Sequence, residues 1–290
     1  MDIKLGKLIA SGAGTDVYEY GADKVCKLNF NKYNANDVKY EFEKTLDAYN
    51  NGLPVPKVYE IVSCNGRFGL IMERVRGVTF NDVLFEHINN CILNNVSQKE
   101  TLQSSYDLHL SQIKDAANFL YKLHQKTCKL KENVKESILW HCRNNRYLRR
   151  DEKNTIEKLI EDLPDSNNVC HGDPNPNNFM YVNNDIHMID WVDCVNAHPF
   201  YDLTEFKLMT LYADPPDDKL LPEYIISFHL RNLDNYVKTF LDEYKKISDI
   251  DLSGMEKWTI PVLVFKMGGN NSGERQRRLL AGISEGLSKL

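Results

Sequence analysis

The stretch "VCHGDPNPNNFMYVNNDIHMIDW", from Val169 to Trp191, places two aspartates and an asparagine at the ends of short apolar runs. The segments "NVC", "FMYV" and "IHMIDW" have the apolar and aromatic character of strands, whereas "HGDPNPNN" and "VNND" are rich in turn-forming residues. Asp173, Asn178 and Asp190 are therefore predicted to lie where strands meet loops. Such an arrangement can bring three oxygen donors to one point.

Oxygen donors of this kind suit Mg²⁺ that arrives with a nucleotide, because this hard ion keeps several waters and takes few protein ligands. Asn178 and Asp190, one predicted hairpin apart, are the candidate metal ligands. Asp173 stands slightly apart from them and is well placed to receive a proton from an attacking hydroxyl. The stretch thus favours a metal-dependent nucleotide site.

Composition sets limits on the function. The 290 residues are 42% hydrophobic, enough to bury a substantial core as one large domain or two lobes. A net charge of -5 gives no broad basic field, so no nucleic-acid partner is predicted. The N-terminus "MDIKLGKLIASG" lacks an apolar signal core, and "WTIPVLVF" is too short to span a bilayer, so no membrane partner is predicted. Seven cysteines without a CxxC pair favour a reducing cytoplasm.

The pattern changes along the chain near Gly77. Before it, short strand-like segments predict a small sheet, interrupted by one helix over 36–50. After it, long amphipathic segments at 108–126 and 224–246 predict a mostly helical part. With "RVRG" as the hinge, the expected division is an N-terminal nucleotide-binding lobe at 1–76 and a C-terminal lobe, with the catalytic loop and acceptor site, at 77–290.

The motif His171-Gly172-Asp173-x-x-x-x-Asn178, followed by Ile189-Asp190-Trp191, resembles the signature of the aminoglycoside phosphotransferase and choline kinase family. The resemblance implies an α+β, two-lobed protein-kinase-like fold with a small antiparallel-sheet N-lobe and a mostly helical C-lobe. It implies Asp173 as the catalytic base and Asn178 and Asp190 as the Mg²⁺ ligands. It also implies that His171 braces the loop and that Asp202, in "FYDL", holds the loop by its backbone.

Upstream segments match the family's nucleotide site. "LIASGAGTDVYEYG" offers a turn at Ser11, Gly12 and Gly14, where small residues let backbone amides approach a phosphate. By resemblance, Lys27 reaches the α and β phosphates and Glu41 holds it. Lys24 is the register alternative to Lys27, and Glu43 is the alternative to Glu41. In "LIMERVRG", the backbone at Glu73 and Val75 would meet the base of ATP or GTP.

The expected function is phosphoryl transfer from ATP or GTP to a hydroxyl of a small molecule. An excess of acids over residues 212–256, which includes "ADPPDDK", hints at a cationic aminosugar or amino-alcohol as acceptor. The alternatives are a choline, ethanolamine or other metabolite kinase and, in a different class, a nucleotide-binding pseudokinase. A protein kinase is disfavoured because only about twenty residues separate Asp190 from the end of the next helical stretch at Tyr212, which leaves little room for a peptide-docking activation segment. Asn175 and Asn177 are expected to be loop formers, and His124 is expected to be packed.

Overall fold

The computed structural model describes residues 3–12, 14–30, 33–214, 221–269 and 272–290. The chain forms two compact units. The first consists of Met1–Val78 and Asn178–Cys194, and the second of Thr79–Asn177 and Val195–Leu290. The division expected from the sequence follows chain order, whereas the compact units place the hairpin after Asn178 with the N-terminal residues. The predicted α+β class, with a small antiparallel sheet and a mostly helical remainder, is confirmed.

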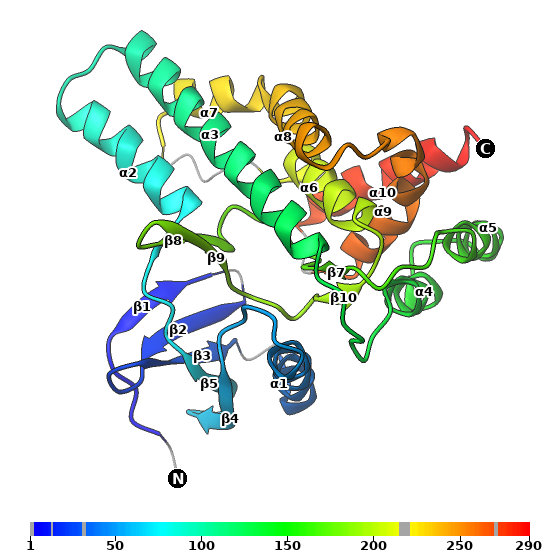
Figure 1. Cartoon of the computed structure of the whole chain (residues 1–290), viewed down its shortest axis with the longest axis horizontal. Coiled ribbons are helices and arrows are strands. Elements are labelled where there is room, and N and C mark those ends of the chain that lie inside the picture. The colour runs from blue at the N-terminus through cyan, green and yellow to red at the C-terminus, as the bar shows by residue number, and fades with distance from the viewer. Residues whose placement is uncertain (1–2, 13, 31–32, 215–220, 270–271) are drawn as a thin grey trace. The chain divides into compact units, whose positions relative to one another are not determined.

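A five-stranded antiparallel sheet dominates the first unit (Figure 1). Its spatial order is β1-β2-β3-β5-β4. Asn65 and Gly66, both with positive φ, form the turn between β4 and β5, as expected for an Asn-Gly hairpin. Apolar side chains from three strands form its core with Cys26 and Ile71 almost fully buried. The strands are β1 (Leu8–Ser11), β2 (Thr15–Glu19), β3 (Lys24–Asn29), β4 (Val58–Cys64) and β5 (Arg67–Glu73).

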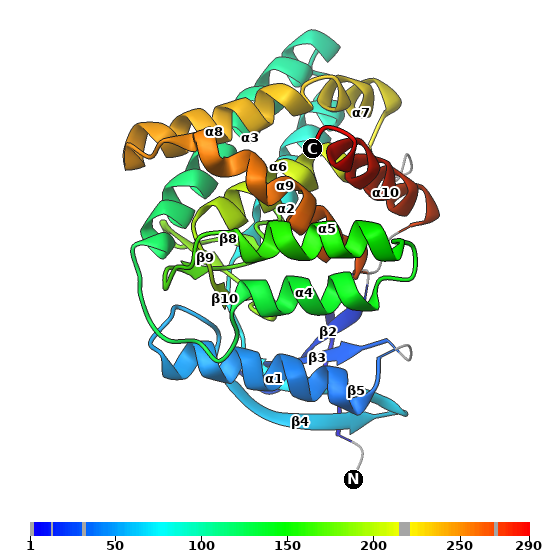
Figure 2. The ribbon, with the colours of Figure 1, turned by 90° about the vertical axis from the view of Figure 1, so that its right-hand side faces the viewer.

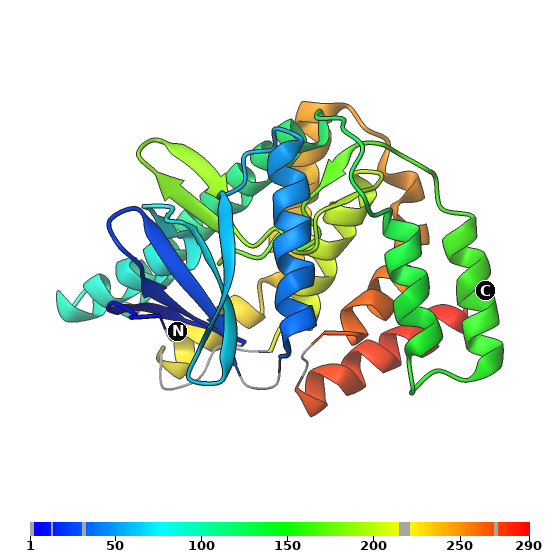
Figure 3. The ribbon, with the colours of Figure 1, turned by 90° about the horizontal axis from the view of Figure 1, so that it is seen from below.

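One helix, α1 (Ala35–Asn50), packs against β4 and β5, and Figure 3 shows it running along the sheet. The side chain of Asn34 caps its first turn and Asp37 completes a capping box. Gly52, at φ +74, follows its C-terminus. Buried side chains recur at helical spacing, and Glu41 is among them. The helix therefore presents a carboxylate on the face that packs on the sheet.

A hairpin of β8 (Phe179–Val182) and β9 (Asp185–Met188) also belongs to the first unit. Asn183, at φ +53, lies in its turn. Gly77 packs so tightly against this hairpin that a Cβ there would lie 2.4 Å from the carbonyl oxygen of Tyr181. The glycine of "RVRG" is thus needed for close approach to β8. Strand β6 (Val78–Thr79) follows at the boundary of the two units.

The second unit is mostly helical. The long helix α3 packs along α8, and α4 and α5 form an antiparallel pair that Figure 2 shows face-on. Two short strands, β7 (Val169–Cys170) and β10 (Val195–Asn196), pair antiparallel. Its helices are α2 (Phe80–Leu93), α3 (Gln98–His124), α4 (Val134–Asn144), α5 (Arg150–Glu161), α6 (Phe200–Tyr212), α7 (Glu223–Leu230), α8 (Leu233–Ser248), the 3₁₀ helix η1 (Leu252–Trp258), α9 (Thr259–Met267) and α10 (Gly273–Leu287).

Two predicted helices differ from the observed ones. The helix expected over 108–126 already begins at Gln98, where the Ser97 side chain caps it by accepting from the amide of Glu100. The helix expected over 224–246 is two helices, α7 and α8. The side chain of Asn232 donates to the carbonyl of Phe228 at this break. Side-chain hydrogen bonds to the backbone therefore accompany helix ends that hydrophobic periodicity does not reveal.

Helix α6 lies at the centre of the second unit and contacts α8, α9, α10 and η1. Phe206 of α6 stacks on Phe240 of α8 with ring centroids 3.8 Å apart. Two acids of the same helix, Asp202 and Glu205, are fully buried. Buried charges need specific partners, so Asp202 and Glu205 must form specific polar contacts in addition to packing. Among the described residues, no helix combines the length and apolarity needed to cross a membrane.

Candidate active site

In the first unit, a buried lysine is held between two carboxylates. Lys27 on β3 places Nζ 2.7 Å from Oε1 of Glu41 on α1 and 2.9 Å from Oδ1 of Asp190, which follows β9. The side chain of Lys27 is 13% exposed and that of Glu41 is 12% exposed. A strand, a helix and a hairpin therefore meet through one ammonium group.

The charge of this lysine is stabilised by its partners. Burial alone disfavours an ammonium ion, but the carboxylates of Asp190 and Glu41 outweigh that cost and raise the pKa of Lys27 above its ordinary value. Lys27 is therefore a permanent cation. A fixed positive charge on a rigid central strand is suited to holding phosphate oxygens.

The two register alternatives lie elsewhere. Glu43 on α1 is half exposed and forms an i,i+4 pair with Lys39 at 3.7 Å. Lys24 places its Nζ 4.1 Å from the ring centre of Tyr59, a cation-π contact on the sheet. Neither residue shares in the contacts between Lys27, Glu41 and Asp190 that the structure records.

The hairpin β8–β9 brings Asn178 and Asp190 to the same open end. Asn178 precedes β8, Asp190 follows β9, and the amide of Ile189 donates to the carbonyl of Asn178 at 3.0 Å. Asp190 has φ +63, an uncommon conformation that aspartate tolerates better than most residues. The Trp191 indole nitrogen donates to the carbonyl of Met188 and anchors the chain after this kink.

This pair fits a magnesium ion by its chemistry. An amide and a carboxylate supply hard oxygen atoms, the ligands that Mg²⁺ prefers, and two protein ligands suffice when phosphates and waters complete the shell. Asn178 is 8% exposed and its position is fixed by the ladder of the hairpin. The residues could therefore hold Mg²⁺ at the edge of the unit that also carries Lys27.

In the second unit, Asp173 lies on the loop that follows β7. Gly172, at φ +84, allows the sharp turn from His171 into this loop. The amide of Asp173 donates to Nδ1 of the buried His171 at 3.3 Å, and its carbonyl accepts from the amide of Asn175. The backbone on both sides of the candidate base is thus held by local bonds.

The two asparagines of the loop have structural contacts. The side-chain oxygen of Asn175 accepts from the amide of Asn177 at 2.9 Å. The side-chain oxygen of Asn177 in turn accepts from the side chain of Asn81 on α2 at 2.8 Å. These bonds are what loop-forming asparagines make.

Asp202 braces the same loop from α6. Its two carboxylate oxygens accept the backbone amides of His171 and Gly172, each at 2.8 Å. His124 lies 3.0 Å from the same carboxylate and 2.7 Å from the hydroxyl of Tyr244. Burial raises the pKa of Asp202, but the bond and charge of His124, with further help from His171 and the amide of Gly172, lower it overall. Asp202 is thus an ionised anchor of the loop.

This buried cluster is a hydrogen-bond network. Potential ligand atoms of His124, Cys170 and Asp202 all lie within 4.8 Å of one another. Both ring nitrogens of His124 are already engaged, by Tyr244 and Asp202, and both oxygens of Asp202 accept backbone amides. The groups that could bind a metal are therefore committed to supporting the loop.

The structure adds two charged residues that the sequence reasoning missed. Lys266 on α9 forms a short ion pair with Glu205 on α6 and places its Nζ 3.7 Å from Oδ1 of Asp173. Glu205 was detectable, because it follows Asp202 by three residues and so shares its helix face. Lys266, the single charge in the apolar helix "TIPVLVFKM", gave a weaker signal.

The proposed phosphate turn lies between β1 and β2. The Ser11 hydroxyl donates to Asp16 at 2.7 Å, and the Gly12 amide donates to the carbonyl of Thr15. The Ser11 bond is the largest influence that lowers the pKa of Asp16. A Cβ at Gly14 would lie 2.8 Å from the hydroxyl of Tyr33, so a larger residue there would require the Tyr33 side chain to move. In this conformation the polar groups of Ser11 and Gly12 serve the turn itself.

The proposed base-binding segment follows β5. Glu73 ends this strand, and its side chain accepts the amide of Lys57 at 3.1 Å. The amide of Arg74 donates to the carbonyl of Asp23. Val75 lies just beyond and is half-buried.

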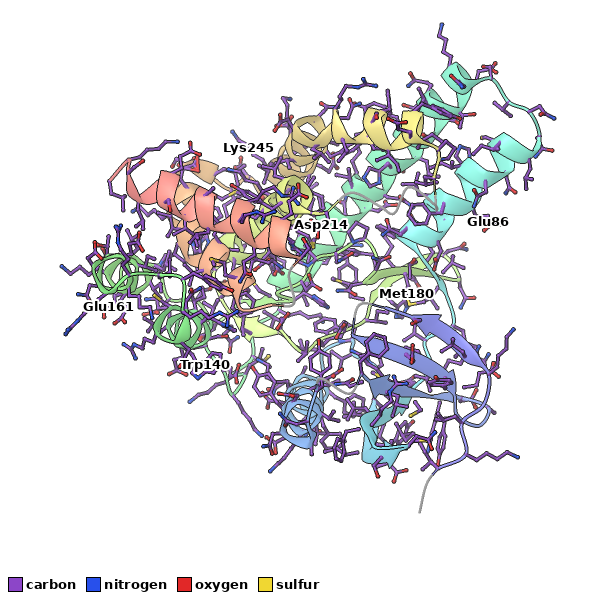
Figure 4. The ribbon with its side chains drawn as sticks, turned by 180° about the vertical axis from the view of Figure 1, so that it is seen from behind. Glu86, Trp140, Glu161, Met180, Asp214 and Lys245 are labelled. Carbon is purple, nitrogen blue, oxygen red and sulfur yellow. The ribbon has the colours of Figure 1, made fainter. Side chains whose placement is uncertain are left out.

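Three acids of residues 212–256 form ion pairs within the second unit. Asp214 lies by α10, as Figure 4 shows, and pairs with Arg278 at 2.8 Å. Asp242 pairs with Lys238 at 2.6 Å and Glu243 with Lys246 at 3.5 Å, both within α8. Because these three charges are offset locally, they give no specific sign of a cationic ligand. Asp217 and Asp218 lie outside the described residues.

Comparisons with known proteins bear on this geometry. A model of the phosphotransferase enzyme family matches residues 6–238. An aminoglycoside-3'-phosphotransferase of type VIII has a similar fold, with a TM-score of 0.55, 18% identity and coverage of 89% of this chain and 91% of that chain. A choline/ethanolamine kinase family protein from Mesorhizobium loti also has a similar fold, with a TM-score of 0.54 and 14% identity. The match covers 98% of this chain and 91% of that chain. No curated protein sequence matches. At such identities, the two structures speak for the fold alone.

Proposed function

Because the chain belongs to the phosphotransferase enzyme family, we propose that it transfers the terminal phosphoryl group of ATP or GTP to a hydroxyl of a small molecule. The family confirms the predicted class, a small-molecule kinase. The observation that carries the donor half of the proposal is the contact of Lys27 with both Glu41 and Asp190. It is the charge arrangement expected of a site for a nucleotide and its metal.

The donor site is assigned to the first unit. Lys27, held by Glu41, contacts phosphate oxygens, and the backbone near Ser11, Gly12 and Gly14 lies over the phosphates. The backbone of Glu73 and Val75 meets the base. Asn178 and Asp190 would hold Mg²⁺, which neutralises charge on the phosphates when it is bound.

The acceptor half is assigned to Asp173. Its carboxylate orients the acceptor hydroxyl and takes its proton as the oxygen forms a bond to the γ-phosphorus, while the bond to the bridging oxygen breaks and the nucleoside diphosphate leaves. Asp202 contributes by fixing the loop through the amides of His171 and Gly172. Little covalent chemistry is required of the protein, so correct positioning is its main contribution.

The proposed acceptor carries an amino group. This rests on two proteins of similar fold, an aminoglycoside phosphotransferase and a choline/ethanolamine kinase family protein. The acids of residues 212–256 add little support, because three of them, Asp214, Asp242 and Glu243, already form ion pairs with basic side chains. A kinase of choline, ethanolamine or another metabolite is the second candidate, favoured by the second of these structures.

A cytoplasmic location also stays part of the proposal. It rests on an odd number of widely spaced cysteines without a CxxC pair, a pattern that fits a reducing compartment.

The test is a screen for nucleoside diphosphate release from ATP and from GTP, with a panel of aminosugars, amino-alcohols and their deaminated analogues. We expect release that depends on one class of amine-bearing acceptor and that stops when EDTA removes Mg²⁺. Equal kcat/KM for an acceptor and its deaminated analogue would remove the amine from the proposal. Magnesium-dependent nucleotide binding without any acceptor-dependent release across the panel would instead favour the pseudokinase.

A further inference from the structure

A buried lysine links helix α6 to the side chain of the candidate base. The Lys266 side chain is 12% exposed and that of Glu205 is fully buried, and the two form a short ion pair. The same ammonium lies 3.7 Å from Oδ1 of Asp173, whose side chain is 30% exposed. The ammonium of Lys266 thus lies close to two carboxylates, the buried one of Glu205 and the more exposed one of Asp173.

Neutralising Glu205 would explain a buried lysine, but it does not explain where this lysine points. A fully buried carboxylate needs a cationic partner, because its desolvation is costly. Lys266 satisfies that need through its short contact with Glu205. Its approach to Asp173 is a second feature, and it concerns the one residue on which acceptor chemistry depends.

Helix α6 therefore reaches the loop in two ways. Asp202 binds the loop backbone through two amides, and Glu205, one turn further, reaches the loop side chain through Lys266. The backbone bonds place the loop, but they leave the side-chain torsions of Asp173 undetermined. An ammonium next to Oδ1 restricts those torsions.

We propose that Lys266 is a positioning residue that, held by Glu205, orients the carboxylate of Asp173 for acceptance of the hydroxyl proton. This inference rests on the proposed function of Asp173. It assigns a role in the reaction to a residue of α9, more than ninety positions after Asp173. Lys266 acts through Asp173 and has no separate role in nucleotide binding.

The contacts of Asp173 decide which kinetic constant should respond. Its Oδ1 lies 3.7 Å from Nζ of Lys266, and the short ion pair with Glu205 holds that ammonium in place. Loss of the ammonium removes a contact that orients the carboxylate, so we expect kcat to fall while the KM for nucleotide changes little.

The experiment compares Lys266→Met, Glu205→Gln and the double variant, with Lys238→Met as the control. Lys238 pairs with Asp242 at the exposed surface of α8 and so matches the chemical change without touching the loop. The double variant is decisive, because it removes the buried pair together and leaves no unpaired buried charge. Each variant is checked for folding by thermal unfolding and for nucleotide affinity before its kinetics are measured.

We expect the double variant to fold, to keep the wild-type KM for nucleotide, and to lose about 10- to 100-fold in kcat. Lys266→Arg, which keeps the positive charge, should lose less. Wild-type kcat in the double variant would overturn the proposal and leave Lys266 only the task of neutralising Glu205. Absence of transfer by the wild-type protein with any acceptor is a separate result, and it would count against the proposed function itself.

Discussion

Lys27 and Glu41 form an ion pair of 2.7 Å that joins the central strand β3 to helix α1. The two residues are fourteen positions apart, and each is placed by its own element. The strand fixes the lysine through its ladder with β2 and β5, and the helix presents Glu41 among its buried residues. The orientation of a phosphate-binding cation therefore depends on the packing of α1.

Glu41→Gln tests this dependence. The substitution keeps the shape but removes one of the two charges that hold Lys27, so we expect the KM for ATP or GTP to rise about tenfold with a smaller change in kcat. Glu43→Gln is the matched control, because that side chain lies on the same helix and pairs only at the surface with Lys39. Equal KM values for both variants would contradict the role assigned to Glu41.

Asp202→Asn tests the anchor of the catalytic loop. Asparagine has one acceptor oxygen, so its NH₂ group must face one of the two amides that the carboxylate now accepts. We expect a loss of about 2–4 kcal/mol in the free energy of unfolding and a fall of at least tenfold in kcat. Urea unfolding and steady-state kinetics measure the two effects. The exposed Asp242→Asn should change neither, and an unaltered kcat in Asp202→Asn would show that the loop needs no such anchor.

A histidine pair in the second unit predicts acid sensitivity. Burial lowers the pKa of His109 to about 4, with a contribution from nearby His229, and burial likewise lowers the pKa of His229 to about 4. Both groups ordinarily titrate near 6.5, so the unfolded chain binds protons more readily than the folded one between these values. The contribution of these two histidines to the free energy of unfolding is fully present above pH 6.5 and is lost as the pH falls towards 4.

The size of this effect is about 2–3 kcal/mol for one such group and is not additive for the two, because their rings lie 5.9 Å apart. Urea unfolding at several pH values from 7 to 4 measures it. His109→Phe should flatten the dependence over this range. The same slope in this variant and in the wild type would mean that other groups, such as the paired carboxylates, dominate acid unfolding.

The sequence was informative where local pattern decides structure. The small sheet of the first unit and helix α1 could be predicted from strand-like segments, turn residues and helical spacing, and an Asn-Gly pair forms the turn between β4 and β5. The break between α7 and α8 could not be predicted in this way, because a side-chain bond of Asn232 accompanies it within a continuous helical pattern.

The candidate site shows the same limit. The motif residues from His171 to Asp190 stand close together in sequence, so their common chemistry could be recognised directly. Lys266 and the contact of His124 with Asp202 depend on tertiary packing between distant helices, and hydrophobic pattern carries no information about such pairs. His124 was expected to be packed, and it is fully buried, but it also binds the anchor of the loop.

The most direct test of the account is the turnover of Asp173→Asn with the best acceptor found and saturating nucleotide. The side chain keeps its size but cannot take up the hydroxyl proton, so we predict a fall in kcat of about a thousandfold or more while nucleotide affinity changes little. A variant that keeps more than about a tenth of wild-type turnover would contradict the assignment of Asp173 as the base and, with it, the proposed mechanism of phosphoryl transfer.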